Sequence, residues 1–375
     1  MACISRALII GGGIAGLSAA IALSRIGVKC DVVELHGVPL GACLGISGRA
    51  AEALDALGVY EECRASSRAF TPDSTVLHQW DAAGNLITPG PKSVNWPGAK
   101  TAIGVYRPNF LQILADAAIR HGADIQVGIT VESLHEEEET TRALFTNGDA
   151  RHYDLVIGAD GINSATRKMA FSEAKTPIYA GQMSIRWMAP GPFLEGEGWY
   201  HGDVGRLGFY HIPQGMIYVP SVITMPEPTR LSNAEIFALF SRLLDSYSAD
   251  AVVELRRRLT PDADLICNSY HWTLLPDPWY KGRTLLIGDA AHATTSHMGM
   301  GGGMALEDSV VLAQSISAAN SLAEALAAFM ARRFARVRTV VEASVAASKL
   351  EQANASPVEK FALIGGAMKI ISQPY

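Results

Sequence analysis

The 375-residue sequence has few charged residues, few aromatic residues and no long apolar run. Charged residues make up 18% of the chain and the formal net charge is −6, so no basic field points to nucleic acid or to an anionic lipid surface. No stretch of 18 apolar residues occurs, and the apolar start at residues 7–10 is too short for a signal peptide. We therefore expect neither a nucleic-acid partner nor stable membrane insertion.

Cysteine is also scarce. The five cysteines, at positions 3, 30, 43, 63 and 267, form no Cys-x-x-Cys pair, so the sequence predicts neither a zinc site nor a disulfide framework. We interpret them as free thiols in a reducing cytosol, predict a cytoplasmic location and expect no metal. Hydrophobic residues are abundant, at 49%, which suits a large core, and the chain length suggests two domains.

The first 35 residues predict a strand, a glycine turn, a helix and a second strand. Residues 7–10 are typical of a buried parallel strand, and the Ala- and Leu-rich residues 17–26 favour a helix. Between them, Gly11-x-Gly13-x-x-Gly16 permits a tight turn, the approach of a pyrophosphate and close helix–strand packing. Glu34 ends the second strand, where it can accept hydrogen bonds from a ribose. This pattern predicts a dinucleotide site without choosing between FAD and NAD.

Two later motifs favour FAD. Asp160-Gly161 follows the apolar residues 155–157, and Gly288-Asp289 follows the mostly apolar residues 284–287. A carboxylate at the end of a strand can bind the ribityl hydroxyls of a flavin. The glycine-rich residues 299–303 then begin a predicted helix, whose N–H groups can stabilise negative charge on a reduced flavin.

The character of the chain changes between these motifs. Residues 176–279 carry β-branched and aromatic runs broken by Pro and Gly, which predicts a mostly antiparallel sheet with one or two helices between residues 233 and 258. Residues 305–350 are rich in alanine and favour helix. We therefore predict the α/β class, with a Rossmann-like FAD-binding domain interrupted by a mostly antiparallel substrate-binding sheet domain and followed by C-terminal helices. The predicted segments are residues 1–70, 102–175 and 280–350 for the FAD domain, residues 71–101 and 176–279 for the sheet domain, and residues 351–375 for a helical tail.

In their order and separations, the three motifs resemble those of the group A flavoprotein monooxygenases, the para-hydroxybenzoate hydroxylase-like family. Arg107 at the start of a predicted helix and the basic residues 332–338 also match family positions. The resemblance covers most of the chain. It implies FAD as cofactor, NADH or NADPH as reductant and O₂ as co-substrate. The implied reaction is hydroxylation of a small aromatic or heteroaromatic compound through a flavin C4a-hydroperoxide.

The resemblance also implies individual roles. Glu34 is expected to hold the adenosine ribose, Arg107 to contact the ribose or pyrophosphate, and Asp289 to bind the ribityl chain. Asp160 is expected to serve both FAD and the nicotinamide nucleotide. The predicted cofactor-binding residues are Gly11, Gly13, Ile14, Ala15, Gly16, Glu34, Leu35, Arg107, Val131, Asp160, Gly288, Asp289, Gly299, Gly301 and Gly302.

The sequence departs from the family pattern near the third motif. Ser296 stands where the family usually has proline, and residues 299–303 read Gly-Met-Gly-Gly-Gly where Gly-Gln-Gly-Ala-Asn is common. Ser296 still supplies a backbone carbonyl, and His297 beside it adds a titratable group. The departures concern the substrate pocket rather than flavin binding.

Four residues are predicted to serve catalysis: His297, Tyr218, His211 and Arg186. A histidine or tyrosine can help to deprotonate a phenol or hydroxypyridine, and an arginine can pair with a substrate carboxylate. Each has an ordinary alternative, namely a core tyrosine, a half-buried histidine, or an arginine that is exposed or binds the nicotinamide phosphates.

Three other functions stay open from the sequence. These are another FAD oxidoreductase, a membrane-associated hydroxylase of a lipid or quinone ring, and a nucleotide-binding protein without turnover. NAD(P)H oxidation that a substrate stimulates separates the last from the others. The substrate, the choice between NADH and NADPH, and the choice between monomer and homodimer are not determined by the sequence.

Overall fold

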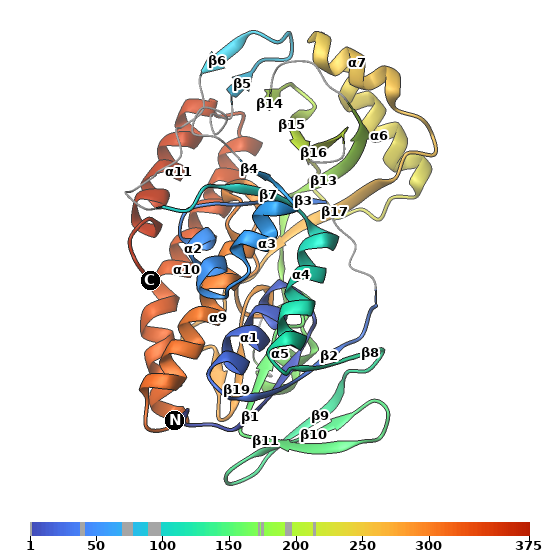
Figure 1. Ribbon diagram of the computed structural model, residues 1–375. Coiled ribbons are helices and arrows are strands. Elements are labelled where there is room, and N and C mark those ends of the chain that lie inside the picture. Colours follow the sequence, from blue (N-terminus) through green and yellow to red (C-terminus); the bar gives the residue numbers. More distant parts are fainter. Residues whose placement is uncertain are drawn as a thin grey trace.

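The computed structural model describes residues 2–37, 42–69, 78–88, 99–171, 173, 176–191, 197–212 and 215–375. Figure 1 shows one large sheet in the lower part of the molecule, a second in the upper part, and long helices along one side. Of the predicted sheet-domain segment 71–101, residues 71–77 and 89–98 lie outside the described residues.

The lower sheet is parallel except at its β18 edge. Its strand order is β18 (Tyr280–Lys281), β19 (Thr284–Leu286), β12 (Leu155–Gly158), β1 (Arg6–Ile10), β2 (Lys29–Glu34) and β8 (Asp124–Val127). Side chains alternate across it, so that Ile9 packs on one face and Leu8 and Ile10 on the other. Because both faces are covered, the strands read as continuous apolar runs, and the predicted buried parallel strand at residues 7–10 is confirmed.

Helices cover one face of the lower sheet, and a small antiparallel sheet covers the other. The helices are α1 (Ile14–Arg25), α2 (Arg49–Ala56), α3 (Tyr60–Ala65), α4 (Arg107–Arg120), α9 (Gly301–Ala318) and α10 (Leu322–Gln352). The small sheet has the order β11 (Ala150–Tyr153), β10 (Thr141–Phe145) and β9 (Val131–Glu136). The Ala-rich segment predicted as helical is interrupted at residues 319–321, where the Ser321 hydroxyl caps the N-terminus of α10.

The upper sheet is antiparallel apart from the parallel pairing of β14 with β5. Its strand order is β17 (Leu265–Trp272), β13 (Ile178–Pro190), β16 (Met216–Thr224), β15 (Gly205–Ile212), β14 (Gly198–His201), β5 (His78–Trp80) and β6 (Leu86–Thr88). One face packs on α6 (Asn233–Asp245) and α7 (Asp250–Arg258) through a core that includes Trp187, Val219 and Phe240. The other face is turned toward α10, because Gln182 and Arg206 bond to Glu351 near the end of that helix.

Further elements complete the fold. They are β3 (Cys43–Ile46), β7 (Ile103–Tyr106) and β4 (Arg68–Ala69), which form a separate sheet, together with α5 (Ala165–Ala170), α8 (Asp289–His292), the 3₁₀ turn η2 (Ser296–Met298) and α11 (Pro357–Ile371). The core beneath the upper sheet is separate from the core around the lower sheet. This separation supports the predicted two domains, and their boundaries stay a prediction.

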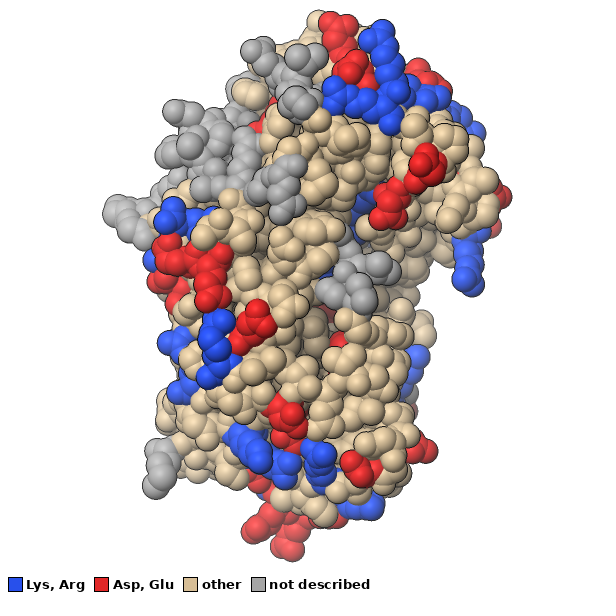
Figure 2. Space-filling view, turned by 45° about the vertical axis from the view of Figure 1, so that its right-hand side comes forward, with Lys and Arg blue, Asp and Glu red and all other residues tan. Residues whose placement is uncertain are grey.

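The surface carries both signs of charge. On the face drawn in Figure 2, acidic and basic side chains are interspersed among uncharged ones. On α7, Arg256 pairs with Asp245 of α6, and Arg258 pairs with Glu254. Among the described residues, none of the helices is both long and apolar enough to cross a membrane. The same residues contain no group of three His, Cys, Asp or Glu side chains arranged for a metal ion.

A buried carboxylate joins the lower sheet to the small sheet beside it. Asp31 Oδ2 accepts hydrogen bonds from the Tyr153 hydroxyl (2.7 Å) and the Arg6 guanidinium (2.6 Å), and Arg151 lies 3.4 Å away. Burial alone would raise the pKa of Asp31, but these bonds and the two positive charges hold it below its ordinary value. Asp31 therefore stabilises the fold as a carboxylate.

Replacing Asp31 with asparagine is expected to lower the free energy of unfolding at neutral pH by about 2 kcal/mol, because Tyr153 and Arg6 lose a charged acceptor. The pKa of Asp31 is lower in the folded than in the unfolded chain. Its contribution is therefore complete above about pH 4 and is lost as the pH falls through the folded pKa. Urea unfolding at several pH values should show the difference between wild type and Asp31→Asn shrinking toward acid. The exposed Asp124→Asn is the control, and a difference independent of pH would contradict this assignment.

Candidate active site

The glycine turn after β1 has the predicted geometry. Gly11 has φ +111°, and a Cβ built on it would lie 2.4 Å from the carbonyl oxygen of Ala159. A Cβ on Gly16 would lie 1.9 Å from the Gly11 oxygen, so α1 passes directly against the turn. A Cβ on Gly13, by contrast, would meet open space among the described residues. A phosphate can therefore approach the backbone at Gly13.

The N-terminus of α1 can bind an anion. Gly13 is the N-cap, and within the described part of the chain no side chain caps this end. The unpaired N–H groups and the helix dipole both favour a phosphate there. Glu34 accepts hydrogen bonds from the backbone N–H groups of Gly12 (2.6 Å) and His36 (2.8 Å). Its carboxylate thus lies at the glycine turn, as the prediction of a ribose-binding acid requires.

Asp160 organises the loop after β12. Its carboxylate accepts hydrogen bonds from the Ser164 hydroxyl (2.5 Å) and the Thr166 backbone N–H (2.9 Å), which order the start of α5. Arg167 of α5 is buried and donates to the carbonyl of Ala290 in α8 (2.8 Å). This bond connects the second predicted motif to the third.

The Gly288-Asp289 turn places a carboxylate in an enclosed but accessible position. Gly288 has φ +56°, and a Cβ on it would lie 2.8 Å from the Cβ of Ala15 in α1. Asp289 begins α8 and has exposed surface. The surrounding protein nevertheless raises the pKa of its carboxyl, against the opposing effects of His292 and Arg107. The Asp289 carboxylate thus combines exposed surface with a raised pKa, and a hydroxyl of a ligand can reach it.

Asp308 of α9 holds the Gly288-Asp289 turn from behind. Its buried carboxylate accepts hydrogen bonds from the Gly288 N–H (3.0 Å) and the Arg333 guanidinium (2.8 Å), and it lies 2.7 Å from His292 Nε2. Burial alone would raise the pKa of Asp308, but His292 and Arg333 hold it below its ordinary value. The contact with Asp308 gives His292 a structural position in this turn.

Glu307 extends this buried cluster. It accepts hydrogen bonds from Arg333 (2.6 Å) and Arg336 (2.7 Å), and all three side chains are at most 8% exposed. The basic residues 332–338 matched a family position in the sequence, but Glu307 and Asp308 were not predicted. Their partners lie about 25 residues further on, beyond the reach of local patterns.

The α8–α9 loop, residues 293–300, leads into a second open helix N-terminus. Gly299 has φ +65° and is exposed. α9 then begins at Gly301, and side chains of the described residues do not cap it. A Cβ on Gly302 would lie 3.6 Å from Ile14 of α1, so the two helix N-termini are neighbours. Both present unpaired N–H groups to the same region.

The three motifs meet because β1, β12 and β19 are adjacent parallel strands. The groups assembled there fit FAD. An open helix N-terminus suits the pyrophosphate, the accessible Asp289 carboxylate suits the ribityl hydroxyls, and a glycine-rich second N-terminus suits the flavin ring. Of the remaining predicted cofactor residues, Leu35 is 51% exposed beyond β2, whereas Val131 is 4% exposed in a core. Only the backbone of Val131 is therefore available to a ligand.

Two of the predicted catalytic residues lie together on the face of the upper sheet that is opposite α6 and α7, which we call the open face. Arg186 pairs with Pro220 and Tyr218 with Met188, which places both side chains on the face opposite α6 and α7. Burial raises the pKa of Tyr218, and the positive charge of Arg186 opposes this rise. Arg186 also acts on Arg107, whose pKa is lowered mainly by burial. Arg186 thus connects the upper sheet electrostatically to Arg107, one of the predicted cofactor-binding residues.

Tyr270 of β17 connects this face to the α8–α9 loop. Its hydroxyl lies 2.6 Å from the Ser296 hydroxyl, at the position where the family usually has proline. Tyr270 also acts electrostatically on Tyr218. It was not predicted, because its only sequence signal was a place on a strand of the expected sheet.

His297 lies in the predicted loop but turns toward α10. Its side chain is 2% exposed, Nδ1 lies 3.0 Å from the Thr295 hydroxyl, and Nε2 lies 3.5 Å from the Glu351 carboxylate. Burial lowers the pKa of His297, with Glu351 opposing. Because both ring nitrogens face protein groups, this geometry does not favour the predicted role of substrate-activating base.

His211 is not brought together with the other candidates. In the hairpin of β15 and β16, Tyr210 pairs with Tyr218 and His211 pairs with Ile217. His211 therefore points to the opposite face of the sheet from Tyr218. There Nδ1 lies 2.8 Å from Glu197, and the side chain is 36% exposed. The sequence placed His211 on the right strand but could not give its face.

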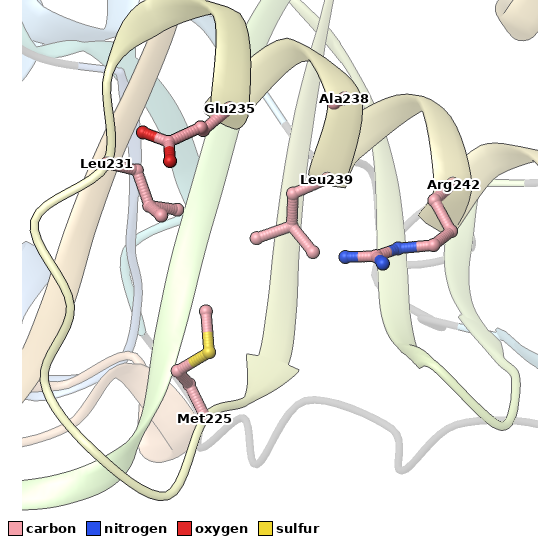
Figure 3. A pocket seen from close by; sticks show the side chains of 6 residues that line it. All are labelled: Met225, Leu231, Glu235, Ala238, Leu239 and Arg242. Carbon is pink, nitrogen blue, oxygen red and sulfur yellow. The ribbon is translucent and has the colours of Figure 1, made fainter.

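A surface pocket lies apart from these residues. Figure 3 shows it between α6 and the chain that follows β16, with Arg242 and Glu235 pointing toward it from the helix. Met225, Leu231, Ala238 and Leu239 complete its lining. Glu235 is already engaged in the N-terminal cap of α6 with Ser232. The pocket shares no residue with the three motifs.

The fold and the converging loops define an FAD-binding oxidoreductase. The sequence profile of the FAD binding domain family matches residues 5–197 and 257–344, and the chain belongs to this family. It is 29% identical over 357 residues to 2-heptyl-3-hydroxy-4(1H)-quinolone synthase of Pseudomonas aeruginosa, covering 92% of this chain and 89% of that one. It is 27% identical over 344 residues to FAD-dependent urate hydroxylase of Klebsiella oxytoca, covering 90% and 88%.

Solved structures share the fold along the whole chain. HpxO of Klebsiella pneumoniae, complexed with FAD and uric acid, superposes with a TM-score of 0.82 at 24% identity and covers 99% of this chain and 97% of that one. These findings confirm the predicted fold class, the FAD cofactor and the family resemblance. The protein is an FAD-dependent monooxygenase.

Replacing Asp289 with alanine is expected to abolish retention of FAD during purification, because the carboxylate acceptor predicted for the ribityl hydroxyls is lost. The absorbance ratio at flavin and protein wavelengths measures the bound fraction. Asp264→Ala, at an exposed position outside the three motifs, is the control and should keep its flavin. An Asp289→Ala protein with full flavin content would show that this carboxylate does not hold the cofactor.

Proposed function

We propose that the protein hydroxylates a small aromatic or heteroaromatic compound at the open face of its upper sheet, with NADH or NADPH as reductant. The observation that carries the proposal is the meeting of Tyr218 and Arg186 on that face, where Tyr270 bonds to Ser296 of the α8–α9 loop. Polar groups able to orient a ring are thus within reach of the loop next to the cofactor site. The chemistry that FAD supplies when bound is the activation of O₂ after reduction by the nicotinamide nucleotide.

Within the cofactor site we propose the following division of roles. The N–H groups at Gly13 hold the pyrophosphate, Glu34 holds the adenosine ribose, and Arg107 contacts the ribose or the phosphates. Asp289 accepts hydrogen bonds from the ribityl chain. Asp160 keeps its loop in place through Ser164 and Thr166, which supports an indirect role in cofactor binding.

On the substrate side, Tyr218 is the group we assign to the ring hydroxyl. Its pKa is raised by burial, so the phenol stays protonated at neutral pH and can donate or relay a proton without being a permanent base. Arg186 supplies a positive charge beside it, which favours an oxyanion or carboxylate on the substrate. A substrate whose ring hydroxyl has lost its proton, with Tyr218 available to relay it, would be stabilised as an oxyanion by Arg186 and would have a more electron-rich ring, while the surrounding aromatic residues exclude water.

The relatives suggest which rings to try first. Their names specify a quinolone for one and urate for another, and both compounds are fused heterocycles containing nitrogen. An oxygen on such a ring would suit Arg186 and Tyr218. We also propose a cytoplasmic location, which the free thiols of the five cysteines support.

A substrate panel tests the reaction. NADH and NADPH oxidation and H₂O₂ release would be followed together for the purified, flavin-loaded protein with hydroxybenzoates, hydroxypyridines, quinolones and purines. One compound is expected to accelerate oxidation with little peroxide, because coupled oxygen transfer consumes the reduced flavin productively. Stimulation by none of them would overturn the proposed substrate class and leave the flavin site standing.

Tyr218→Phe should lower the hydroxylation rate about 10- to 100-fold with the best compound of that panel, because a positioned proton donor is lost. Reduction of the flavin by NAD(P)H, measured anaerobically by stopped flow, should change much less. Tyr280→Phe, on the β18 edge of the lower sheet, is the matched control. An equal loss in both half-reactions of Tyr218→Phe would argue against a role at the substrate.

A further inference from the structure

Glu351, in the last turn of α10, is the centre of a buried polar cluster that the roles assigned above do not use. It lies where the α8–α9 loop, the open face of the upper sheet and the start of α11 come together. Its side chain is 13% exposed. The cluster therefore connects the loop next to the cofactor site to the sheet that carries Tyr218.

The Glu351 carboxylate contacts a group from each of these parts. Arg206 of β15 lies 2.7 Å away, Lys360 of α11 lies 3.3 Å away, and His297 of the α8–α9 loop lies 3.5 Å away. Gln182 of β13 donates a hydrogen bond of 3.0 Å. The Glu351 carboxylate thus joins β13, β15, the α8–α9 loop and α11.

The positive charges in the cluster determine the ionisation state of the Glu351 carboxylate. Burial alone would raise the pKa of Glu351, but Arg206, His297 and Lys360 hold it well below its ordinary range, so it stays ionised. The nearby His201 is desolvated and has a pKa of about 3, with Lys360 and Arg206 lowering it further. Since His201 is neutral, the Glu351 carboxylate is the negative charge between the two largely buried cations, Arg206 and Lys360.

The contacts continue from the cluster to the substrate side. The Arg206 guanidinium lies 3.9 Å above the ring of Trp199. Trp199 packs edge-on against Tyr210 at 6.0 Å, and Tyr210 lies 6.1 Å from Tyr218. Displacement of Arg206 would therefore shift the aromatic wall on which Tyr218 lies.

The contacts also continue to the cofactor side. His297 Nδ1 lies 3.0 Å from the Thr295 hydroxyl, which lies 3.0 Å from the hydroxyl of Ser344 in α10. Ser344 in turn donates to the Thr295 carbonyl (2.6 Å). The α8–α9 loop is thus attached to α10 at Ser344 and again at Glu351, two turns apart.

We propose that Glu351 is a positioning residue that holds the α8–α9 loop against the aromatic wall of the upper sheet and so closes this side of the active site to water. The proposal rests on the proposed function for its catalytic meaning, but the contact itself does not depend on the substrate. Without the carboxylate, Arg206 and Lys360 repel each other and draw in water. Water beside the loop would reach the cofactor site from the α10 side.

The test uses Glu351→Gln, which keeps the size of the side chain and removes its charge. Glu342→Gln is the matched control, because Glu342 lies on the same helix, is 68% exposed and, among the described residues, has only a distant ion pair with Arg338 (3.8 Å). The measurements are the FAD dissociation constant of the apoprotein, iodide quenching of the bound flavin, and H₂O₂ formed per NAD(P)H oxidised. The first two need neither a substrate nor turnover.

Glu351→Gln is expected to raise the iodide quenching constant at least about threefold and to increase the peroxide fraction, since water reaches the flavin. Its FAD dissociation constant should stay within about threefold of wild type, because the phosphate and ribityl contacts are elsewhere. Glu342→Gln should match wild type throughout. Wild-type quenching in folded, flavin-loaded Glu351→Gln would overturn the proposal.

A second variant covers the case in which Glu351→Gln does not fold. The double variant Arg206→Gln, Glu351→Gln removes one charge of each sign, so it restores the charge balance while the connection stays broken. It is expected to fold and to show the same increase in quenching, and quenching at the wild-type level would overturn the proposal. If wild type hydroxylates no ring in the panel, the proposed function fails, yet the quenching result still decides whether Glu351 closes the site.

Discussion

The arrangement of the cofactor loops depends on one buried carboxylate, that of Asp308. It binds the Gly288 N–H, His292 and Arg333 at once, and none of these groups can be solvated by water in its place. Removing one partner of a buried charge typically costs about 3–5 kcal/mol, because the remaining charge is left in an apolar interior. Asp308 lies in the helix that begins at the glycine-rich loop. The turn that presents Asp289 and the helix that we propose faces the flavin are therefore held in register by the Asp308 side chain.

The cofactor half of the protein could be predicted from sequence because its signals are local. The glycines at 11, 13 and 16 are required by a turn that closes within six residues, and Glu34 follows from the length of one helix and one strand. Asp289 was predicted because it follows shortly after a buried strand. The groups that hold these motifs in place were not predicted. Arg167 reaches Ala290, and Glu307 reaches Arg336, across separations that no periodic pattern spans.

The substrate half shows why strand prediction alone does not define a site. His211 and Tyr218 lie on adjacent strands, as expected, but a register that pairs Tyr210 with Tyr218 turns His211 to the other face. A shift of β15 by one residue would have placed His211 on the same face as Tyr218. The same alternation brought Arg186 and Tyr218 together. His297 shows the corresponding limit for loops, since its position in the chain was informative and the direction of its ring was set by Glu351 and Thr295.

The contrast between the cofactor half and the substrate half has a physical cause. FAD is recognised mainly by backbone N–H groups and by carboxylates at strand ends, and these features are inseparable from the fold itself. A substrate ring meets side chains on alternate positions of an antiparallel sheet, and each of those positions can change without disturbing the sheet. Relatives can therefore share the whole fold and cofactor while acting on different rings. In this chain the two halves meet at a polar seam, where charges such as Glu351 contact groups from both halves. Because that seam is polar and buried, its groups have to match one another in charge and hydrogen bonding. A change in the substrate wall that moved Arg206 would therefore disturb Glu351 before it affected the cofactor side.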